Sequence, residues 1–169
     1  MKRLVYITIL ICSVQASLIA QKSPAQKQQQ RYYRMVDDLL SHTVDEISVN
    51  DSIASDVIFL DSRSEKEYKI SHIENARYVG YDDFDLSSIE DIDKTTELIV
   101  YCSVGYRSEK VAQKLKKAGY SNVKNLIGGV FDWTNQDKTV VDSLGNPTEA
   151  VHGYNPSWGK WLTKAKAVY

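Results

Sequence analysis

Residues 98–108 read LIVYCSVGYRS, and this stretch decides the fold. Its first four residues form an unbroken apolar run, which is typical of a short strand buried on both faces. Cys102 follows at once, and Gly105 and Arg107 come just before an amphipathic segment, Ser108–Ala118. In that segment apolar residues recur at helical spacing, lysines lie on the opposite face, and a glycine ends it. The stretch therefore predicts a strand, a tight loop and a helix.

The same alternation of apolar runs and amphipathic segments extends outward over residues 47–141. The further strand candidates are Val57–Leu60, Ala76–Val79 and Val123–Ile127. Between the first two, the segment Ser64–Ile70 begins with the capping-box pair Ser64 and Glu67 and predicts a short helix. Apolar runs of this kind are typical of parallel strands covered by helices. We expect a doubly wound α/β domain with a mostly parallel five-stranded sheet and helices on both faces.

Residues 1–20 have a composition of their own. A positive pair at the start is followed by an apolar run over Leu4–Val14 and then by small residues, the order of a secretory signal peptide. Cleavage is expected after Ala16 or Ala20. Because the run is shorter than the about 20 residues of a membrane-spanning helix, an uncleaved anchor is the weaker alternative. We expect an exported protein, periplasmic or extracellular, that is free of the membrane after cleavage.

Two flanking segments, 21–46 and 142–169, extend the domain. Residues 21–34 are rich in Gln and Lys without apolar periodicity, so they predict a flexible linker. Residues 35–40 predict one or two helical turns. The C-terminal segment begins with a turn-rich stretch and then carries the apolar residues Tyr154, Trp158, Trp161 and Leu162. We expect it to be an aromatic extension packed on the domain, with a helix starting at Pro156 and extending to Leu162.

Composition and charge exclude several classes of function. Hydrophobic residues make up 43% of the chain and charged residues 25%, as in soluble globular proteins. The net charge is −1, and loss of Lys2 and Arg3 with the signal peptide lowers it to −3. No basic surplus remains to bind nucleic acid or anionic lipid. Three scattered histidines and one mature cysteine show no ligand spacing, so we expect no metal site and no cofactor.

Cys102 is the one cysteine of the mature chain, because Cys12 leaves with the signal peptide. No intramolecular disulfide can then form. A thiol between a strand end and a helix N-terminus faces unpaired N–H groups and the positive end of the helix dipole, and Arg107 adds a charge. These surroundings favour a thiolate that attacks an anionic substrate. The alternative is a small buried cysteine that only ends a core strand.

Three separated motifs resemble those of the rhodanese family of sulfurtransferases. They are Cys102-Ser103-Val104-Gly105-Tyr106-Arg107-Ser108, the upstream Asp61-Ser62-Arg63 with Glu67-Tyr68 and His72-Ile73, and the downstream Gly128-Gly129-Val130-Phe131-Asp132-Trp133. The resemblance covers about residues 47–140 and implies a rhodanese-like fold. It also implies a reaction in which Cys102 takes a sulfane sulfur from a small anionic donor, thiosulfate or polysulfide, and passes it to a thiol, cyanide or protein acceptor.

The resemblance further implies roles for individual residues. Cys102 would carry the persulfide, and the substrate would bind on the loop residues Ser103, Val104, Gly105, Tyr106, Arg107 and Ser108. The position of Asp61 at the end of the Val57–Leu60 strand separately suggests a supporting role, either orienting the loop or Arg107 or capping a turn toward Ser64. Arg63 would also support the site, either by adding charge to the pocket or by pairing with Glu67. His72 belongs to the fold and not to catalysis in this pattern.

Two other functions stay open at this point. One is a sulfur-carrier or protein-binding module that does not turn over. The other is a phosphatase, because related dual-specificity phosphatases use a similar loop with five residues between cysteine and arginine. Here Arg107 follows Cys102 after four residues. The shorter loop leaves less room for a phosphate and favours sulfur transfer.

Overall fold

A computed structural model describes residues 22–169, so the predicted signal peptide lies outside the described residues. The chain divides between Arg34 and Met35 into two compact units, and the second holds the main sheet and Cys102. Within the described residues no helix combines the length and apolarity needed to cross a bilayer.

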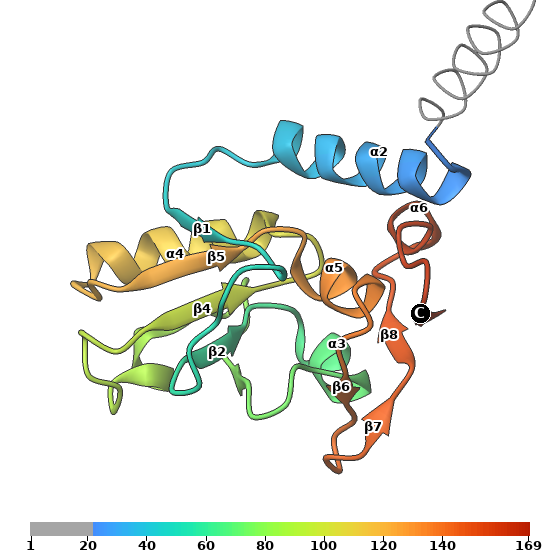
Figure 1. Ribbon diagram of the computed structural model, residues 1–169. Helices are drawn as coiled ribbons and strands as arrows, with labels where there is room; N and C mark the ends of the chain where they lie inside the picture. Colours follow the sequence, from blue (N-terminus) through green and yellow to red (C-terminus); the bar gives the residue numbers. More distant parts are fainter. Residues whose placement is uncertain (1–21) are drawn as a thin grey trace, which may run out of the picture. The chain divides into compact units, whose positions relative to one another are not determined.

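The main sheet contains five strands, all parallel to their neighbours (Figure 1). The strands are β1 (Asp45–Ile47), β2 (Ile58–Asp61), β3 (Arg77–Tyr78), β4 (Leu98–Tyr101) and β5 (Val123–Leu126), in the spatial order β1-β5-β4-β2-β3. The central strand β4 has the predicted bounds. It is paired on both sides, with β2 and β5, which explains why its sequence is apolar throughout. The predicted five-stranded α/β fold is confirmed.

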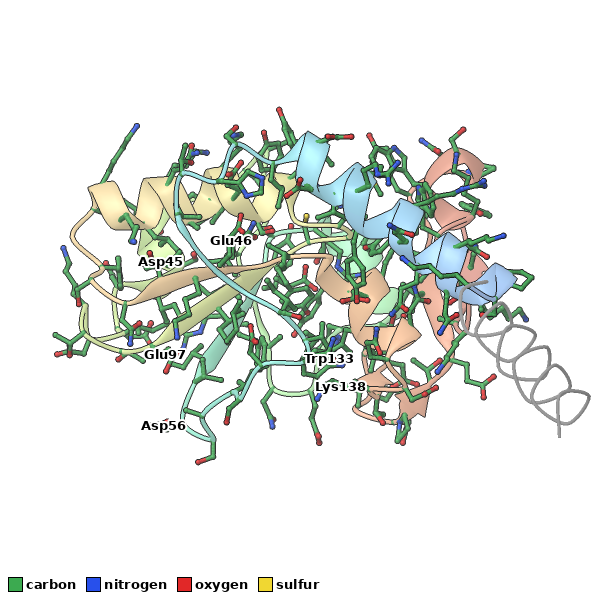
Figure 2. The ribbon with its side chains drawn as sticks, turned by 45° about the horizontal axis from the view of Figure 1, so that its top comes forward. Asp45, Glu46, Asp56, Glu97, Trp133 and Lys138 are labelled. Atoms are coloured by element: carbon green, nitrogen blue, oxygen red, sulfur yellow. The ribbon has the colours of Figure 1, made fainter. Side chains whose placement is uncertain are left out.

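Helices cover both faces of this sheet. They are α3 (Glu65–Ile70), the 3-10 helix η1 (Leu86–Ile89), α4 (Tyr106–Lys117) and α5 (Gly129–Asn135). On one face, Val100 of β4 belongs to the same buried cluster as Leu115 of α4. On the other face, Phe59 of β2 packs edge-on against Trp133 of α5, with ring centroids 5.5 Å apart. Lys138 Nζ lies 5.1 Å from the Trp133 ring centroid, and Figure 2 labels both residues.

The starts of α3 and α4 fix the groups around the cysteine. Ser64 caps α3, and its backbone N–H donates to the Glu67 carboxylate at 2.9 Å, which confirms the predicted capping box. Helix α4 begins at Tyr106, two residues earlier than the pattern predicts. Gly105 is its N-cap with φ of 117°, a backbone angle that favours glycine. Arg107 and Ser108 therefore belong to the first turn of α4.

The expectation of a flexible linker over residues 21–34 is wrong for most of that range. Helix α2 runs without interruption over Pro24–Leu39. Ser23 and Gln26 form a reciprocal pair, since the Gln26 N–H donates to Ser23 Oγ at 3.2 Å and the Ser23 N–H to Gln26 Oε1 at 2.9 Å. Proline follows this cap at the first helical position, and Gln, Lys and Arg are good helix formers. Capping and propensity form the helix where apolar periodicity is missing.

The C-terminal extension contains more regular structure than predicted. Its elements are β7 (Pro147–Thr148), antiparallel to β6 (Val140–Val141), β8 (Ala150–His152), parallel to β9 (Lys166–Val168), and α6 (Pro156–Gly159). The helix starts as predicted, capped by Asn155, but ends at Gly159, before Trp161 and Leu162. A side chain at Gly159 would meet the Tyr169 hydroxyl at 2.2 Å, so the returning C-terminus packs closely at this point. On the domain side, the Asn135 amide of α5 donates to the Trp161 carbonyl at 2.8 Å.

Candidate active site

Cys102 lies directly after β4 and just before the N-terminus of α4. Its side chain is buried, with 1% exposed. The Gly105 N–H donates a hydrogen bond to Cys102 Sγ with an N···S distance of 3.1 Å. The left-handed conformation of Gly105 turns that N–H back toward the sulfur. This is the arrangement expected from the strand–loop–helix sequence.

A buried amide from the neighbouring strand braces the loop. Asn125 of β5 is fully buried and donates from Nδ2 to the Gly105 carbonyl at 3.1 Å. The Ser108 hydroxyl donates to Asn125 Oδ1 at 2.7 Å. Sequence reasoning missed Asn125, although a polar residue inside an apolar run was a signal. Its register position opposite Val100 places it beside the active loop.

The Gly128-Gly129 turn braces the loop from α5. The Val130 N–H donates to the Cys102 carbonyl at 2.9 Å, and the Phe131 N–H to the Ser103 carbonyl at 3.1 Å. A Cβ at Gly129 would lie 2.3 Å from the Cys102 carbonyl oxygen. The close backbone approach explains why glycine is required there.

Arg107 points to Glu67, an acidic residue that sequence analysis assigned to capping α3 and considered as a partner of Arg63. Its Nη1 and Nη2 donate to the two carboxylate oxygens of Glu67 at 2.8 and 2.7 Å, and Nη2 also donates to Ser103 Oγ at 3.0 Å. Burial alone would raise the pKa of Glu67, but the bonds and charge of Arg107 hold it at about 2. The same pair raises the pKa of Arg107. Glu67 therefore joins α3 to the nucleophile loop.

Asp61 and Arg63 form a second, fully buried ion pair. Arg63 Nη2 lies 2.6 Å from Asp61 Oδ2 and donates to the Ser71 carbonyl at 2.6 Å. Neither residue lines the cavity that holds Cys102. Of the two roles considered for Arg63, charge for the pocket or pairing with Glu67, the pairing is wrong, because Arg107 holds that carboxylate and Arg63 pairs with Asp61. Both side chains are fully buried outside the cavity lining.

The electrostatic surroundings favour the thiolate of Cys102. Burial by itself would raise the pKa of the thiol, but the Arg107 charge and hydrogen bonds from Ser108 and Gly105 lower it below the ordinary value. The Ser108 hydroxyl has a single proton, and Asn125 Oδ1 is a near acceptor for it. The backbone N–H groups and Arg107 are therefore the main groups that stabilise the charged sulfur.

Cys102 and Arg107 open into a cavity of about 410 Å³. Its walls are mostly apolar or aromatic, formed by Leu39, Tyr81, Val104, Tyr106, Tyr154 and Trp158. Sequence analysis placed Val104 and Tyr106 here but assigned the C-terminal aromatics to packing. Tyr154 instead lies over the Arg107 guanidinium, 5.6 Å from ring centroid to Cζ. The extension therefore forms part of the site.

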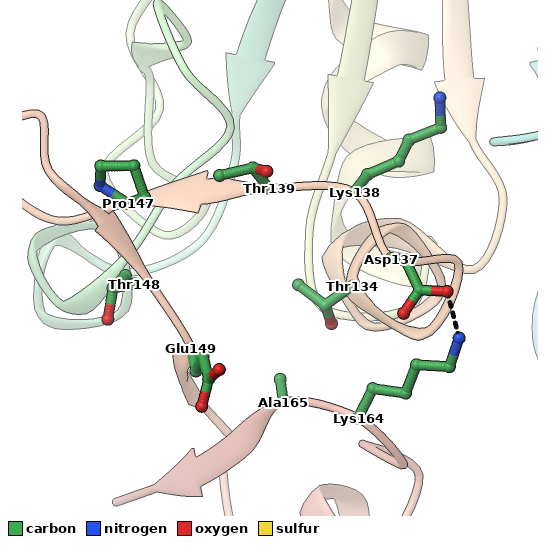
Figure 3. Close-up of a pocket in the computed structure, with 9 residues that line it drawn as sticks. All are labelled: Thr134, Asp137, Lys138, Thr139, Pro147, Thr148, Glu149, Lys164 and Ala165. Atoms are coloured by element: carbon green, nitrogen blue, oxygen red, sulfur yellow. Dashed lines mark hydrogen bonds and ion pairs between the residues drawn. The ribbon is translucent and has the colours of Figure 1, made fainter.

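A second cavity, of about 460 Å³, lies between the end of α5 and the C-terminal strands (Figure 3). Figure 3 shows Lys164 paired with Asp137, while the remaining lining is formed by threonines and other short side chains together with Lys138 and Glu149. It contains no thiol or histidine. The chemistry that the sequence predicts therefore belongs to the first cavity.

The described histidines and acids offer no alternative centre. Across residues 22–169 no group of three or more His, Cys, Asp or Glu side chains is arranged to hold a metal ion. His72 stacks on Tyr68 with ring centroids 3.9 Å apart, and its Nδ1 lies 3.0 Å from the Tyr68 carbonyl oxygen. This contact is local to α3, in keeping with the structural role expected for His72.

Comparison with known proteins assigns the class. Residues 45–136 match the family described as Rhodanese-like domain, and because the match covers more than half of the chain, the protein belongs to this family. Curated relatives include the tRNA uridine(34) hydroxylases of Pectobacterium carotovorum subsp. carotovorum (strain PC1), 32% identical over 88 residues, and Yersinia pestis (strain Pestoides F), 33% identical over 88 residues. Each match covers 49% of this chain and 25% of the relative, so the chain spans about a quarter of their length.

Solved structures agree on the fold. The BH2092 protein from Bacillus halodurans is 27% identical with a TM-score of 0.54, over 69% of this chain and 88% of that one. Thiosulfate sulfurtransferase from Pseudomonas aeruginosa is 21% identical with a TM-score of 0.56, over 68% of this chain and 23% of that one. At that identity the second likeness concerns the fold alone.

Proposed function

We propose that this protein is a sulfurtransferase in which Cys102 carries a sulfane sulfur from a donor such as thiosulfate or polysulfide to a thiol, cyanide or protein acceptor. The observation that carries the proposal is the Gly105 N–H bonded to Cys102 Sγ at 3.1 Å, inside a cavity shared with Arg107. A buried thiol with a lowered pKa, an amide donor and access to a cavity is suited to nucleophilic attack on sulfur.

The proposed reaction has two half-steps. In the first, the Cys102 thiolate attacks the outer sulfur of the donor, a bond from Sγ to that sulfur forms, and the donor's sulfane bond breaks. The departing group, sulfite for thiosulfate, leaves with the bonding electron pair. In the second, the acceptor attacks the outer persulfide sulfur and the electron pair returns to Sγ. The Gly105 N–H stabilises the charge that returns.

Intact-mass spectrometry tests the proposal. After incubation with excess thiosulfate or polysulfide, we expect the reduced protein to gain one sulfur atom, about 32 mass units, on Cys102. Cys102→Ala should keep its fold, because the residue starts a loop, and should gain nothing. Absence of the adduct from the wild-type protein with both donors would overturn the assignment.

A second candidate is a sulfur carrier that binds the persulfide without repeated turnover. The 1% exposure of Cys102 favours it, because a deeply placed sulfur is shielded from a bulky acceptor. Thiocyanate production from cyanide separates the two. Many equivalents of thiocyanate per protein support the enzyme, whereas a single equivalent supports the carrier.

We further propose that the protein is exported, on the sequence of residues 1–20. Cell fractionation and the mass of the mature chain test this, with cleavage expected after Ala16 or Ala20. The names of the curated relatives refer to tRNA, and we do not extend that substrate to this protein. A net charge of −1 offers no basic surplus for nucleic acid.

A further inference from the structure

The cavity beside Cys102 offers little free positive charge to a donor. Among the described residues that line it, Arg107 is the one basic residue, and both of its terminal nitrogens are bonded to Glu67, which carries the opposite charge. Tyr154 covers the guanidinium, and Asp82 adds a carboxylate to the lining. A dianion such as thiosulfate would have to leave water for a site whose arginine is already neutralised.

Two lysines of α4 lie near the aromatic walls of the cavity, and one of them is paired with a carboxylate. Lys110 Nζ lies 5.4 Å from the Tyr106 ring centroid, but it is paired with Glu109 at 2.9 Å. Lys114 Nζ lies 6.0 Å from the Tyr81 ring centroid. Both lysines contact aromatic rings of the cavity walls, but neither is part of the cavity lining.

The walls suit an apolar body. Trp158 of α6 and Tyr154 come from the extension, and Tyr106 from the first turn of α4. Tyr106 and Tyr154 are 42% and 55% exposed, although most large apolar side chains of the domain are buried. Exposed aromatic rings gathered around a nucleophile gain contact area when an apolar ligand enters.

We propose that the preferred donor is an organic sulfane-sulfur compound with a single negative charge and an aromatic or branched aliphatic body, in preference to inorganic thiosulfate. This inference rests on the proposed persulfide chemistry of Cys102. For an organic thiosulfonate, the Cys102 thiolate and RSO2–S⁻ give Cys–S–S⁻ and RSO2⁻. The new bond joins Sγ to the donor's outer sulfur, and the sulfinate leaves with the electron pair of the broken bond.

Three donors separate charge from apolar contact. Thiosulfate is a dianion, methanethiosulfonate a small monoanion, and 4-toluenethiosulfonate a monoanion of the same kind with an aromatic body. The rate of the mass gain on the mature protein, in which Cys102 is the one thiol, is measured with each donor. It is divided by the rate of the same donor with N-acetylcysteine to remove intrinsic reactivity. The variants are Trp158→Ala and Tyr106→Ala. The exposed Leu144, 84% accessible and absent from the cavity lining, gives the control Leu144→Ala.

We expect the ratio of the 4-toluenethiosulfonate rate to the methanethiosulfonate rate to be at least about tenfold higher for the protein than for the free thiol, as burial of one ring allows. Thiosulfate should be the slowest donor after correction. Trp158→Ala and Tyr106→Ala should each lower the ratio, and Leu144→Ala should not. Tyr106 is partly exposed, so Tyr106→Ala should leave the core intact. This variant still tests the inference if Trp158→Ala fails to fold.

Two results would overturn the inference about the donor and leave the proposed function in place. They are a corrected rate that is highest for thiosulfate, and a ratio equal to that of the free thiol in the wild-type protein. If no donor, polysulfide included, adds sulfur to Cys102, the proposed function fails with it. The two failures are therefore distinguishable.

Discussion

Glu67 holds Arg107 through both terminal guanidinium nitrogens, at 2.8 and 2.7 Å, with only 2% of the Glu67 side chain exposed. The same carboxylate accepts the Ser64 N–H at 2.9 Å and so completes the cap of α3. One side chain therefore joins a helix start to the charge that faces the Cys102 thiol.

The charge of Arg107 should set the reactivity of the thiol. Arg107 lowers the pKa of Cys102 against the effect of burial, so Arg107→Gln should raise that pKa and reduce the thiolate fraction at neutral pH. Alkylation by iodoacetamide across a pH series measures the midpoint. Arg107→Lys keeps a positive charge, so its midpoint should lie between those of the wild-type protein and Arg107→Gln. Identical midpoints in the wild-type protein and Arg107→Gln would contradict the assignment.

Glu67 should make stability depend on acid pH. Its pKa is lowered from 4.5 to about 2 in the folded protein, by Arg107 and the Ser64 cap against burial. The stabilisation is therefore complete above the unfolded pKa and is lost as the pH falls through about 4.5 toward 2. The loss should amount to about 3 kcal/mol by this linkage.

Urea unfolding between pH 7 and pH 2.5 measures that loss. Other carboxylates also titrate there, so the informative quantity is the difference between the wild-type protein and Glu67→Gln. Glu67→Gln should be less stable at neutral pH, and the gap should narrow as the pH falls. A stability difference that stays constant with pH would show that the charge of Glu67 does not contribute to folding stability.

Local sequence was sufficient for the elements that position Cys102. The apolar run of β4 and the cap of α3 were predicted because each depends on neighbouring residues. Asn125, Tyr154 and Trp158 reach the site only through the parallel pairing of β5 and the return of the extension. Such contacts join residues far apart in the chain, so a local pattern can mark a residue such as Asn125 as unusual but does not give its partner. The partner of Arg107 was missed for the same reason, because Glu67 is 40 residues away.

The buried Asp61–Arg63 pair should be important to stability once formed. Asp61→Asn leaves Arg63, which is 0% exposed, without its counter-charge and should cost about 3–5 kcal/mol. Replacing both, as Asp61→Asn with Arg63→Met, removes the buried charge and should recover part of the loss. Urea unfolding of the two single variants and the double variant forms the cycle. A double variant as unstable as the sum of the singles would show that the two side chains act independently.

The approach of α5 to the active loop gives a matched pair of glycine variants. Gly129 has φ of 53°, and an added Cβ would lie 2.3 Å from the Cys102 carbonyl oxygen. Gly145 also has a positive φ, 81°, but an added Cβ would meet no heavy atom within 4 Å. Both Gly→Ala changes carry a backbone cost of about 1–2 kcal/mol. Only Gly129→Ala must also move the loop that holds Cys102 and Ser103.

Gly129→Ala should therefore lose more stability than Gly145→Ala and should also slow sulfur loading of Cys102. Thermal unfolding and the rate of the 4-toluenethiosulfonate mass gain are measured on both variants. Loading at the wild-type rate is expected for Gly145→Ala, which lies in the turn after β6. If Gly129→Ala were destabilised to the same degree as Gly145→Ala and loaded sulfur normally, the backbone contact of α5 would not control the loop. A slower Gly129→Ala that stays folded would show that the turn holds the Cys102 carbonyl, and with it the nucleophile, in place.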